Sequence, residues 1–162
     1  MLRGHKSIKV CYVIRMEVRH IHKNHNVTLL LYHLVCSVKY RRKVLTKTIA
    51  QTLKNTCLEI EQRYEIKYIE IGTDDDHVHF MIQGIPTLSP KQIVQITKSI
   101  TARIILKEHP EVKKTLWGGK FWTNGYYINT VSKYANEKII KNYVKNQGKN
   151  YDILHHKQLT LF

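Results

Sequence analysis

His77 and His79 flank one apolar residue, Val78, in a stretch that alternates like a β-strand. Successive strand side chains point to opposite faces of a sheet, so the two imidazoles share one face and Val78 points to the other. A strand that presents two imidazoles in this way can offer both to one metal ion. The alternative is a pair of half-exposed polar residues on the wet side of a sheet. The same pattern recurs at His20 and His22, among charged residues and with no matching partner helix, and we expect no site there.

A second pair of candidate groups lies on a helix that we expect over residues 137–147. Tyr143 and Gln147 are four positions apart, so they share one helical face with Cβ atoms about 5–6 Å apart. Tyr143 offers a phenol oxygen and Gln147 an amide oxygen. Two imidazoles, one amide oxygen and open positions for water and a phosphate oxygen suit Mg²⁺ or Mn²⁺ better than structural zinc. The chain has ten tyrosines, and most of them are expected to serve packing. Tyr143 is singled out because it lies on the expected helix beside Gln147.

Apolar periodicity predicts the elements that position these groups. A nearly continuous apolar run predicts a central strand at 27–38, buried on both sides, in which His33 is an interior histidine and not a ligand. Further strands are expected at 66–73, 77–84 and 120–131, and helices at about 48–64, 90–108 and 137–147. Their predicted N-caps are Thr46 or Thr48, Ser89 and Asn136. Two apolar stripes are expected to face the sheet: Ile49, Leu53, Cys57, Ile60 and Tyr64, and then Ile93, Ile96, Ile100 and Ile104.

The element order strand, helix, strand, strand, helix, strand predicts an α+β fold of the ferredoxin-like split βαβ type. Two helices cover one face of an antiparallel sheet, and an extra C-terminal helix carries Tyr143. The expected organisation is an N-terminal extension over 1–25, either loose or an added strand, a domain over 26–150 and a tail over 151–162. Asp76 closes the acidic turn before His77; it can orient that imidazole from behind, or the turn is simply solvated.

The charge of the chain points to a polyanionic partner. Of 162 residues, 27 are Lys or Arg and 12 are Asp or Glu, a formal net charge of +15. Such a field favours nucleic acid over a membrane surface, because no basic amphipathic helix with a broad apolar face is evident. Tyr40 lies inside one basic cluster, where it either stacks on a base or packs in the core. The expected DNA-contacting residues are Lys39, Arg41, Arg42, Lys43, Lys141 and Lys145.

Three cysteines without a CxxC pair argue against a disulfide framework and for a reducing compartment. No apolar run is long enough to span a bilayer and no secretory signal is evident, so we expect a cytoplasmic protein that does not enter a membrane.

Several stretches resemble the single-tyrosine HUH transposases of small bacterial insertion sequences, in the same order along the chain. These are YHLV at 32–35, KYRRKVL at 39–45, DHVH at 76–79, LW at 116–117, FWTNGYYINTV at 121–131 and IIKNYVKNQ at 139–147. The resemblance covers about residues 26–148. Ser132 and Lys133 depart from it, because small glycine-like residues are expected there.

The resemblance implies an enzyme that cuts and rejoins single-stranded DNA at transposon ends that fold into hairpins. His77, His79 and Gln147 then hold Mg²⁺ or Mn²⁺, and Tyr143 attacks the DNA to form a 5′-phosphotyrosine without ATP. It further implies a homodimer, in which the tyrosine helix completes the histidine pair either of its own subunit or of the partner. Two alternatives are a non-catalytic RNA- or DNA-binding ferredoxin-like module, and a domesticated HUH endonuclease that acts on chromosomal palindromic repeats.

Overall fold

The computed structural model describes residues 10–12 and 18–132, with side chains from Val18 onward. Residues up to 130 belong to one compact unit. The predicted nucleophile helix at 137–147, with Tyr143, Gln147, Lys141 and Lys145, lies outside the described residues, as does its predicted cap Asn136.

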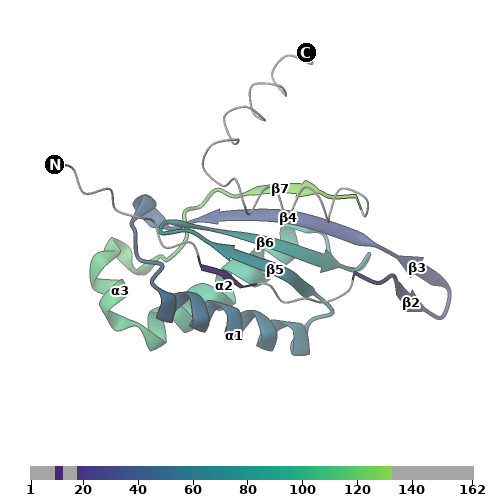
Figure 1. Ribbon diagram of the computed structural model, residues 1–162, viewed down its shortest axis with the longest axis horizontal. Helices are drawn as coiled ribbons and strands as arrows, with labels where there is room; N and C mark the ends of the chain where they lie inside the picture. Colours follow the sequence, from purple (N-terminus) through teal and green to yellow (C-terminus); the bar gives the residue numbers. More distant parts are fainter. Residues whose placement is uncertain (1–9, 13–17, 133–162) are drawn as a thin grey trace, which may run out of the picture. The chain divides into compact units, whose positions relative to one another are not determined.

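The described unit contains the predicted split βαβ fold. Its core elements in chain order are β4 (Leu30–Ser37), α1 (Lys47–Arg63), β5 (Lys67–Thr73), β6 (His77–Gly84), α2 (Pro90–Glu108) and β7 (Tyr127–Thr130). The sheet order is β1-β5-β6-β4-β7, and each neighbouring pair is antiparallel. Helices α1 and α2 cover one face of this sheet (Figure 1). The ferredoxin-like prediction is confirmed for these elements.

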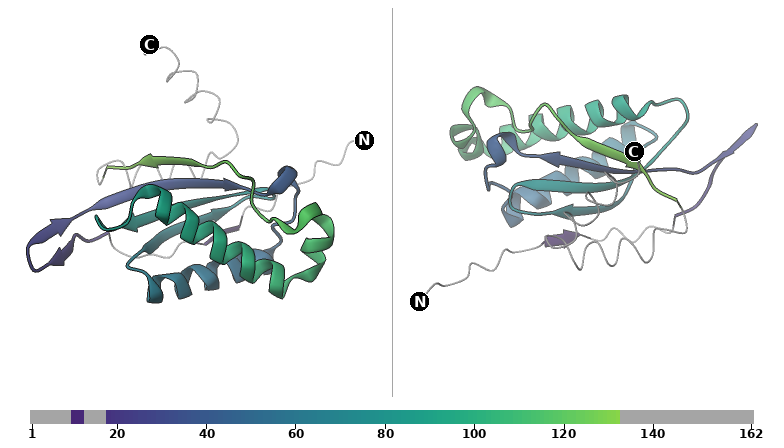
Figure 2. Two further views of the ribbon diagram at one scale, coloured as in Figure 1. Left: turned by 180° about the vertical axis from the view of Figure 1, so that it is seen from behind. Right: turned by 90° about the horizontal axis from the view of Figure 1, so that it is seen from above.

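Several shorter elements complete the described residues, and of these only an added strand in the N-terminal extension was among the predicted alternatives. At one edge of the sheet, β1 (Val10–Tyr12) pairs with β5. A separate hairpin consists of β2 (Ile21–Lys23) and β3 (Asn26–Thr28). It extends away from the sheet in the view of Figure 1 and in both views of Figure 2. After α2 come α3 (Pro110–Thr115) and the 3₁₀ turn η2 (Trp117–Gly119). A second 3₁₀ turn, η1 (Lys39–Arg41), follows β4.

The predicted central strand at 27–38 is too long and is not buried on both sides. Strand β4 begins at Leu30, because residues 26–28 pair with β2 in the hairpin instead; Val27 is 58% exposed there. Within β4, the side chains of Leu34 and Cys36 are fully buried against the helices. Alternate residues such as His33 and Val35 are only half-buried on the opposite face. One strand face therefore builds the core, and the other remains accessible for a site.

The predicted strand at 120–131 is also wrong over its first half. Only a single bridge, Val38 to Trp122, and the short β7 pair with the sheet. Between them the backbone turns toward Lys98 of α2, whose amine donates to three consecutive carbonyl oxygens, those of Thr123, Asn124 and Gly125, at 2.8, 3.1 and 3.1 Å. These carbonyls are satisfied by a cation and need no ladder partner.

Both core helices begin where the sequence indicates. Thr46 accepts a hydrogen bond from the Ile49 backbone at the start of α1, so Thr46 is the cap and Thr48 is not. Ser89 and Gln92 form a reciprocal capping box at α2, with Pro90 at its first turn.

The predicted apolar stripes need correction. Tyr64 is 37% exposed, since it follows the last turn of α1. On α2 the fully buried face includes Thr97 and Thr101, whereas Ile96, Ile100 and Ile104 are only partly buried. Within the described residues, no helix is long and apolar enough to cross a membrane.

Candidate active site

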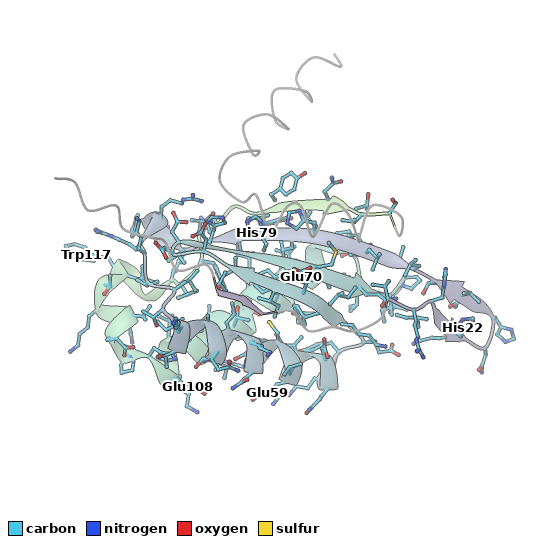
Figure 3. The ribbon with its side chains drawn as sticks, in the orientation of Figure 1. His22, Glu59, Glu70, His79, Glu108 and Trp117 are labelled. Carbon is cyan, nitrogen blue, oxygen red and sulfur yellow. The ribbon has the colours of Figure 1, made fainter. Side chains whose placement is uncertain are left out.

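The two histidines of interest lie on β6 and face away from the helices, as the alternation predicts. Val78, Phe80 and Ile82, on the other face of β6, are completely buried in the core. His77 is opposite Ser37 and His79 is opposite Val35 in the pairing with β4. Their ring centroids are 4.9 Å apart (Figure 3, where His79 is labelled). The fold therefore brings both imidazoles together on the sheet face that α1 and α2 leave open.

Asp76 orients the ring of His77. Its Oδ1 lies 2.7 Å from Nδ1 of His77, and its Oδ2 lies 2.9 Å from Nε of Arg41. Arg41 in turn donates from Nη1 to Oγ of Ser37 at 2.9 Å. A neutral His77 that donates from Nδ1 to this carboxylate carries its lone pair on Nε2, which is the arrangement of metal-binding histidines with a carboxylate behind them. Arg41 was predicted to contact DNA, which stays a prediction; in the structure it pairs with Asp76.

His33 contacts Nδ1 of His79, as Asp76 contacts Nδ1 of His77. Its Nε2 lies 3.0 Å from Nδ1 of His79, and the two rings are stacked, with centroids 5.2 Å apart and planes 9° apart. In the tautomer that ligates a metal through Nε2, His79 donates this hydrogen bond and His33 accepts it. His33 thus has a hydrogen-bond partner, which the sequence did not identify, and it lies half-buried on the open face of β4 and not in the interior as predicted.

Burial keeps both of these rings neutral. Desolvation lowers the pKa of His33 to about 4. Desolvation also lowers the pKa of His79 to about 3, and the nearby His33 and His77 add to that effect. Only a neutral imidazole has a lone pair for a metal ion, so burial prepares His79 for ligation at neutral pH.

The turn η1 carries backbone strain next to these histidines. Tyr40 and Arg41 have positive φ values of 59° and 53°, which is uncommon for residues other than glycine. Three backbone hydrogen bonds hold the turn: from Lys39 to the Phe121 carbonyl at 2.8 Å, from Arg41 to the Val38 carbonyl at 2.9 Å, and from Arg42 to the Lys39 carbonyl at 3.4 Å. Backbone strain of this kind persists where contacts with neighbouring segments fix the backbone conformation. In this protein the strained turn η1 directs the Arg41 side chain at Asp76.

The predicted DNA contacts in this region are accessible to varying degrees. Arg42 and Lys43 are exposed and Lys39 is half-exposed. Lys43 lies 4.0 Å from a carboxylate oxygen of Asp75, and the Lys39 amine lies 5.0 Å from the ring centre of Tyr40. Tyr40 itself is 60% exposed, so of its two predicted roles core packing is excluded.

The described residues fit part of a divalent metal site. His77 and His79 each have Nδ1 engaged, which assigns Nε2 to any metal ion. Within residues 18–132, no group of three His, Cys, Asp or Glu side chains could hold a metal ion by itself. Further ligands must therefore come from other residue types, from residues outside this range, from DNA or from water. The predicted ligand Gln147 lies outside the described residues and stays a prediction.

Comparison with known proteins agrees with this geometry. Residues 26–147 match the family described as "Transposase IS200 like". The chain is 34% identical over 116 residues to the ISDra2 transposase TnpA of Deinococcus radiodurans, covering 72% of this chain and 82% of that protein. It is 25% identical over 120 residues to the transposase for insertion sequence element IS200 of Salmonella typhimurium, covering 72% of this chain and 75% of that protein.

A solved structure extends the comparison to the fold. A crystal structure of a protein from Deinococcus radiodurans assigned as a transposase superposes with a TM-score of 0.64 and 28% identity, covering 78% of this chain and 97% of that one. The family match spans most of the chain and includes both histidines of β6. The chain therefore belongs to the IS200-like transposase family.

Proposed function

We propose that this transposase cuts and rejoins single-stranded DNA at hairpin-bearing transposon ends, with Tyr143 as the nucleophile. The observation that carries the proposal is the pair of imidazoles on the open face of β6, each with Nδ1 engaged by a neighbouring side chain. A module that only binds DNA has no use for two neighbouring histidines whose Nδ1 atoms are both engaged, an arrangement that leaves Nε2 of each ring as the candidate metal ligand. The basic residues of η1 and the following loop supply the attraction for phosphate.

His77 and His79 would hold the divalent cation, Mg²⁺ or Mn²⁺, with Gln147 as the third protein ligand. When bound, such an ion polarises the scissile phosphate and stabilises the negative charge that develops on its oxygens. Asp76 and His33 keep the two imidazoles in the ligating tautomer, so little reorganisation is needed when DNA arrives.

Tyr143 would carry out the covalent step. Its phenolate oxygen forms a bond to the phosphorus, and the bond to the 3′ oxygen breaks. The departing oxygen takes up a proton and becomes a free 3′ hydroxyl, while the 5′ phosphate stays on the tyrosine. Attack by another 3′ hydroxyl reverses these steps and reseals the strand, so the energy of the phosphodiester bond is retained and no ATP is required. An unperturbed phenol has a pKa of about 10, and a bound metal ion together with neighbouring positive charge would favour its ionised form.

The direct test is covalent capture of DNA. The full chain is incubated with a labelled single-stranded hairpin oligonucleotide and Mn²⁺, and the products are separated on a denaturing gel. We expect a protein–DNA adduct with wild type and none with Tyr143→Phe. The matched control is Tyr64→Phe, which removes an exposed phenol at the end of α1 and should leave the adduct unchanged.

Three results of this test would contradict the proposal. An adduct in Tyr143→Phe would mean a different nucleophile, and cleavage that survives EDTA would remove the metal from the reaction. Binding of the hairpin without any adduct would indicate a non-catalytic module.

Mixing inactive His77→Ala with inactive Tyr143→Phe tests how a dimer would build its active sites. Regained activity requires an active site shared between two subunits, and its absence requires each subunit to use its own.

A further inference from the structure

Two aromatic side chains are left in water at the end of the sheet where β4 terminates. Trp117 is 80% exposed and Tyr40 is 60% exposed, the two largest values among the large apolar side chains of the described residues. Trp117 is labelled at the edge of the molecule in Figure 3. A scattered apolar residue on a surface is ordinary. Two exposed aromatic rings at one end of the sheet, in a strongly basic chain, however, indicate a binding surface for a ligand.

The backbone brings these two rings to the same end of the sheet. Lys39 donates to the Phe121 carbonyl at 2.8 Å, which joins η1 to the segment after η2. Trp117 precedes Phe121 by four residues, so their Cα atoms are at most about 14 Å apart. The turn η1 and the helix α3 lie at this same end of the sheet in every view (Figures 1 and 2).

Both rings sit on turns that have left-handed backbone conformations. Gly118 and Gly119 follow Trp117 with φ values of 80° and 65°, and before it Leu116 is completely buried. The indole is thus anchored by its neighbour and held outward. Tyr40 has φ of 59° and also projects into solvent. These positions are determined by the backbone and not by contacts of the rings with the core.

Exposed basic residues lie close in sequence to both rings. Lys113, Lys114 and Lys120 are exposed on either side of Trp117, and Arg42 and Lys43 are exposed beyond Tyr40. In the turn before β6, Asp74 lies 4.0 Å from Nε2 of His77, and Asp75 and Asp76 face Lys43 and Arg41. At the start of α3, Glu111 lies 3.3 Å from His109, and Glu108 accepts a hydrogen bond from Thr52 at 3.4 Å. Each of these acidic groups thus has a partner, and the exposed lysines Lys113, Lys114 and Lys120 lie within four residues of Trp117 in the sequence.

We propose that this end surface, formed by Trp117, Tyr40, Lys113, Lys114, Lys120 and Arg42, binds unpaired nucleotides of the DNA by stacking their bases on the two rings. It rests on the proposed function, since the strand is that of the same DNA substrate. Every base has a flat face, and stacking on an aromatic ring tolerates any sequence, while lysines hold the backbone. A base-paired duplex hides these faces, so the surface selects the single strand.

The surface leads directly to the imidazole pair. Tyr40 is followed by Arg41, which is bonded to Asp76, and Asp76 is bonded to His77. A strand stacked on Tyr40 therefore passes beside the residues that would hold the metal ion. Stacking here would set which phosphate reaches them.

The two tryptophans of the chain make a selective optical test possible. Trp122 is 5% exposed and its indole nitrogen is hydrogen bonded to Thr101 at 3.0 Å, so fluorescence that responds to DNA comes mainly from Trp117. The full chain is titrated in EDTA, which prevents cutting, with oligothymidylate, with an abasic strand of equal phosphate number and with a duplex. We expect quenching with oligothymidylate and little with the other two, since only the first offers free bases.

Substitution gives the energetic part of the test. Trp117→Ala should bind oligothymidylate about 5- to 150-fold more weakly, the usual effect of losing one stacked base, and should bind the abasic strand as wild type does. Trp117→Phe, which keeps a ring, should recover part of the affinity. Tyr64→Ala, at the opposite end of α1, is the matched control and should change neither.

The proposal is overturned if Trp117→Ala binds oligothymidylate like wild type, or if the abasic strand or the duplex quenches as strongly. Those results would leave only an electrostatic surface. The outcome is separable from that of the capture test: loss of stacking would leave the Tyr143 adduct on a hairpin, and loss of the adduct would leave the quenching in EDTA.

Discussion

Replacing His33 by phenylalanine should weaken metal binding without touching a proposed ligand. The new side chain keeps a flat ring that can stack on His79, but it removes the nitrogen that lies 3.0 Å from Nδ1 of His79. His79 then loses the acceptor that favours its Nδ1–H tautomer. Its Nε2, the nitrogen assigned to the metal ion, carries the proton more often and binds less well.

The expected effect can be estimated from the structure. His79 is only 8% exposed, so water is a poor substitute for the lost partner. Leaving a buried donor without an acceptor costs about 1–3 kcal/mol. At about 1.4 kcal/mol per tenfold, this corresponds to roughly 5- to 150-fold weaker binding, close to the 10- to 100-fold usual for partners behind metal-binding histidines.

The measurement is calorimetric titration of the full chain with Mn²⁺, together with ¹⁵N NMR of the histidine rings, which reports the tautomer of His79 directly. The matched control is His22→Phe, an exposed histidine of the other His-x-His pair, which should change neither quantity. A His33→Phe protein that binds Mn²⁺ like wild type, while His79→Ala loses binding, would refute the positioning role. A thermal melt checks that the variant remains folded.

Three further predictions concern stability. In Gly84→Ala, the new Cβ would lie 2.8 Å from Cδ1 of Ile93, so the free energy of unfolding should fall by about 1–3 kcal/mol in urea titrations; an unchanged midpoint would mean that the helix yields freely. In Lys98→Met, three carbonyls lose their cation, so hydrogen exchange in β7 should become faster while the exchange in β5 stays slow. Burial lowers the pKa of His33 to about 4 and that of His79 to about 3, from 6.5 in the unfolded chain, so the unfolded state binds more protons in this range. Metal-free protein should therefore lose stability as pH falls from about 6.5 toward 4, at up to about 1.4 kcal/mol per pH unit and per histidine, and His33→Phe should lose less; equal pH dependence of the two proteins would contradict the assigned burial.

The β5–β6 hairpin and its histidine pair could be read from the sequence because the signals are local. Strand β6 runs from His77 to Gly84, as alternation predicts, and Val78, Phe80 and Ile82 share the core face; the residues of the opposite face are also buried from His79 onward. An acidic turn of three residues separates two runs that alternate, and this leaves few other ways to pair them. Residue spacing was sufficient there because each face of the strand meets one kind of surroundings.

The buried face of α2 could not be read in the same way. Ile96 and Ile100 look like core residues, whereas Thr97 and Thr101 are fully buried in their place. The threonines are buried because two large side chains from elsewhere in the chain need polar partners. Tyr68 bonds Thr97 at 2.8 Å, and the indole of Trp122 donates to Thr101 at 3.0 Å. Side chains distant in sequence decided the rotation of this helix.

The same reasoning explains why the sequence predicted an interior position for His33 and did not reveal its contact with His79. In the register of β4 and β6, His33 is opposite Met81 and His79 is opposite Val35, so the two histidines are diagonal neighbours on one face. A shift of one residue in the pairing would have put His33 on the other face, away from His79. No local pattern fixes that register.

Two identical local patterns therefore differ in what they can do. His22 belongs to an exposed two-stranded hairpin. Among the hydrogen bonds shown for the described residues, none joins its ring to another imidazole or to a carboxylate. His79 lies on a central strand, flanked on one side by β4 with His33 and preceded by the turn that carries Asp76. An imidazole becomes a useful ligand when its second nitrogen is held and its ring is kept neutral, and both conditions come from the neighbouring strand. For that reason the substitution at His33, rather than at either histidine of the motif, is the one that separates a positioned pair from a coincidence of spacing.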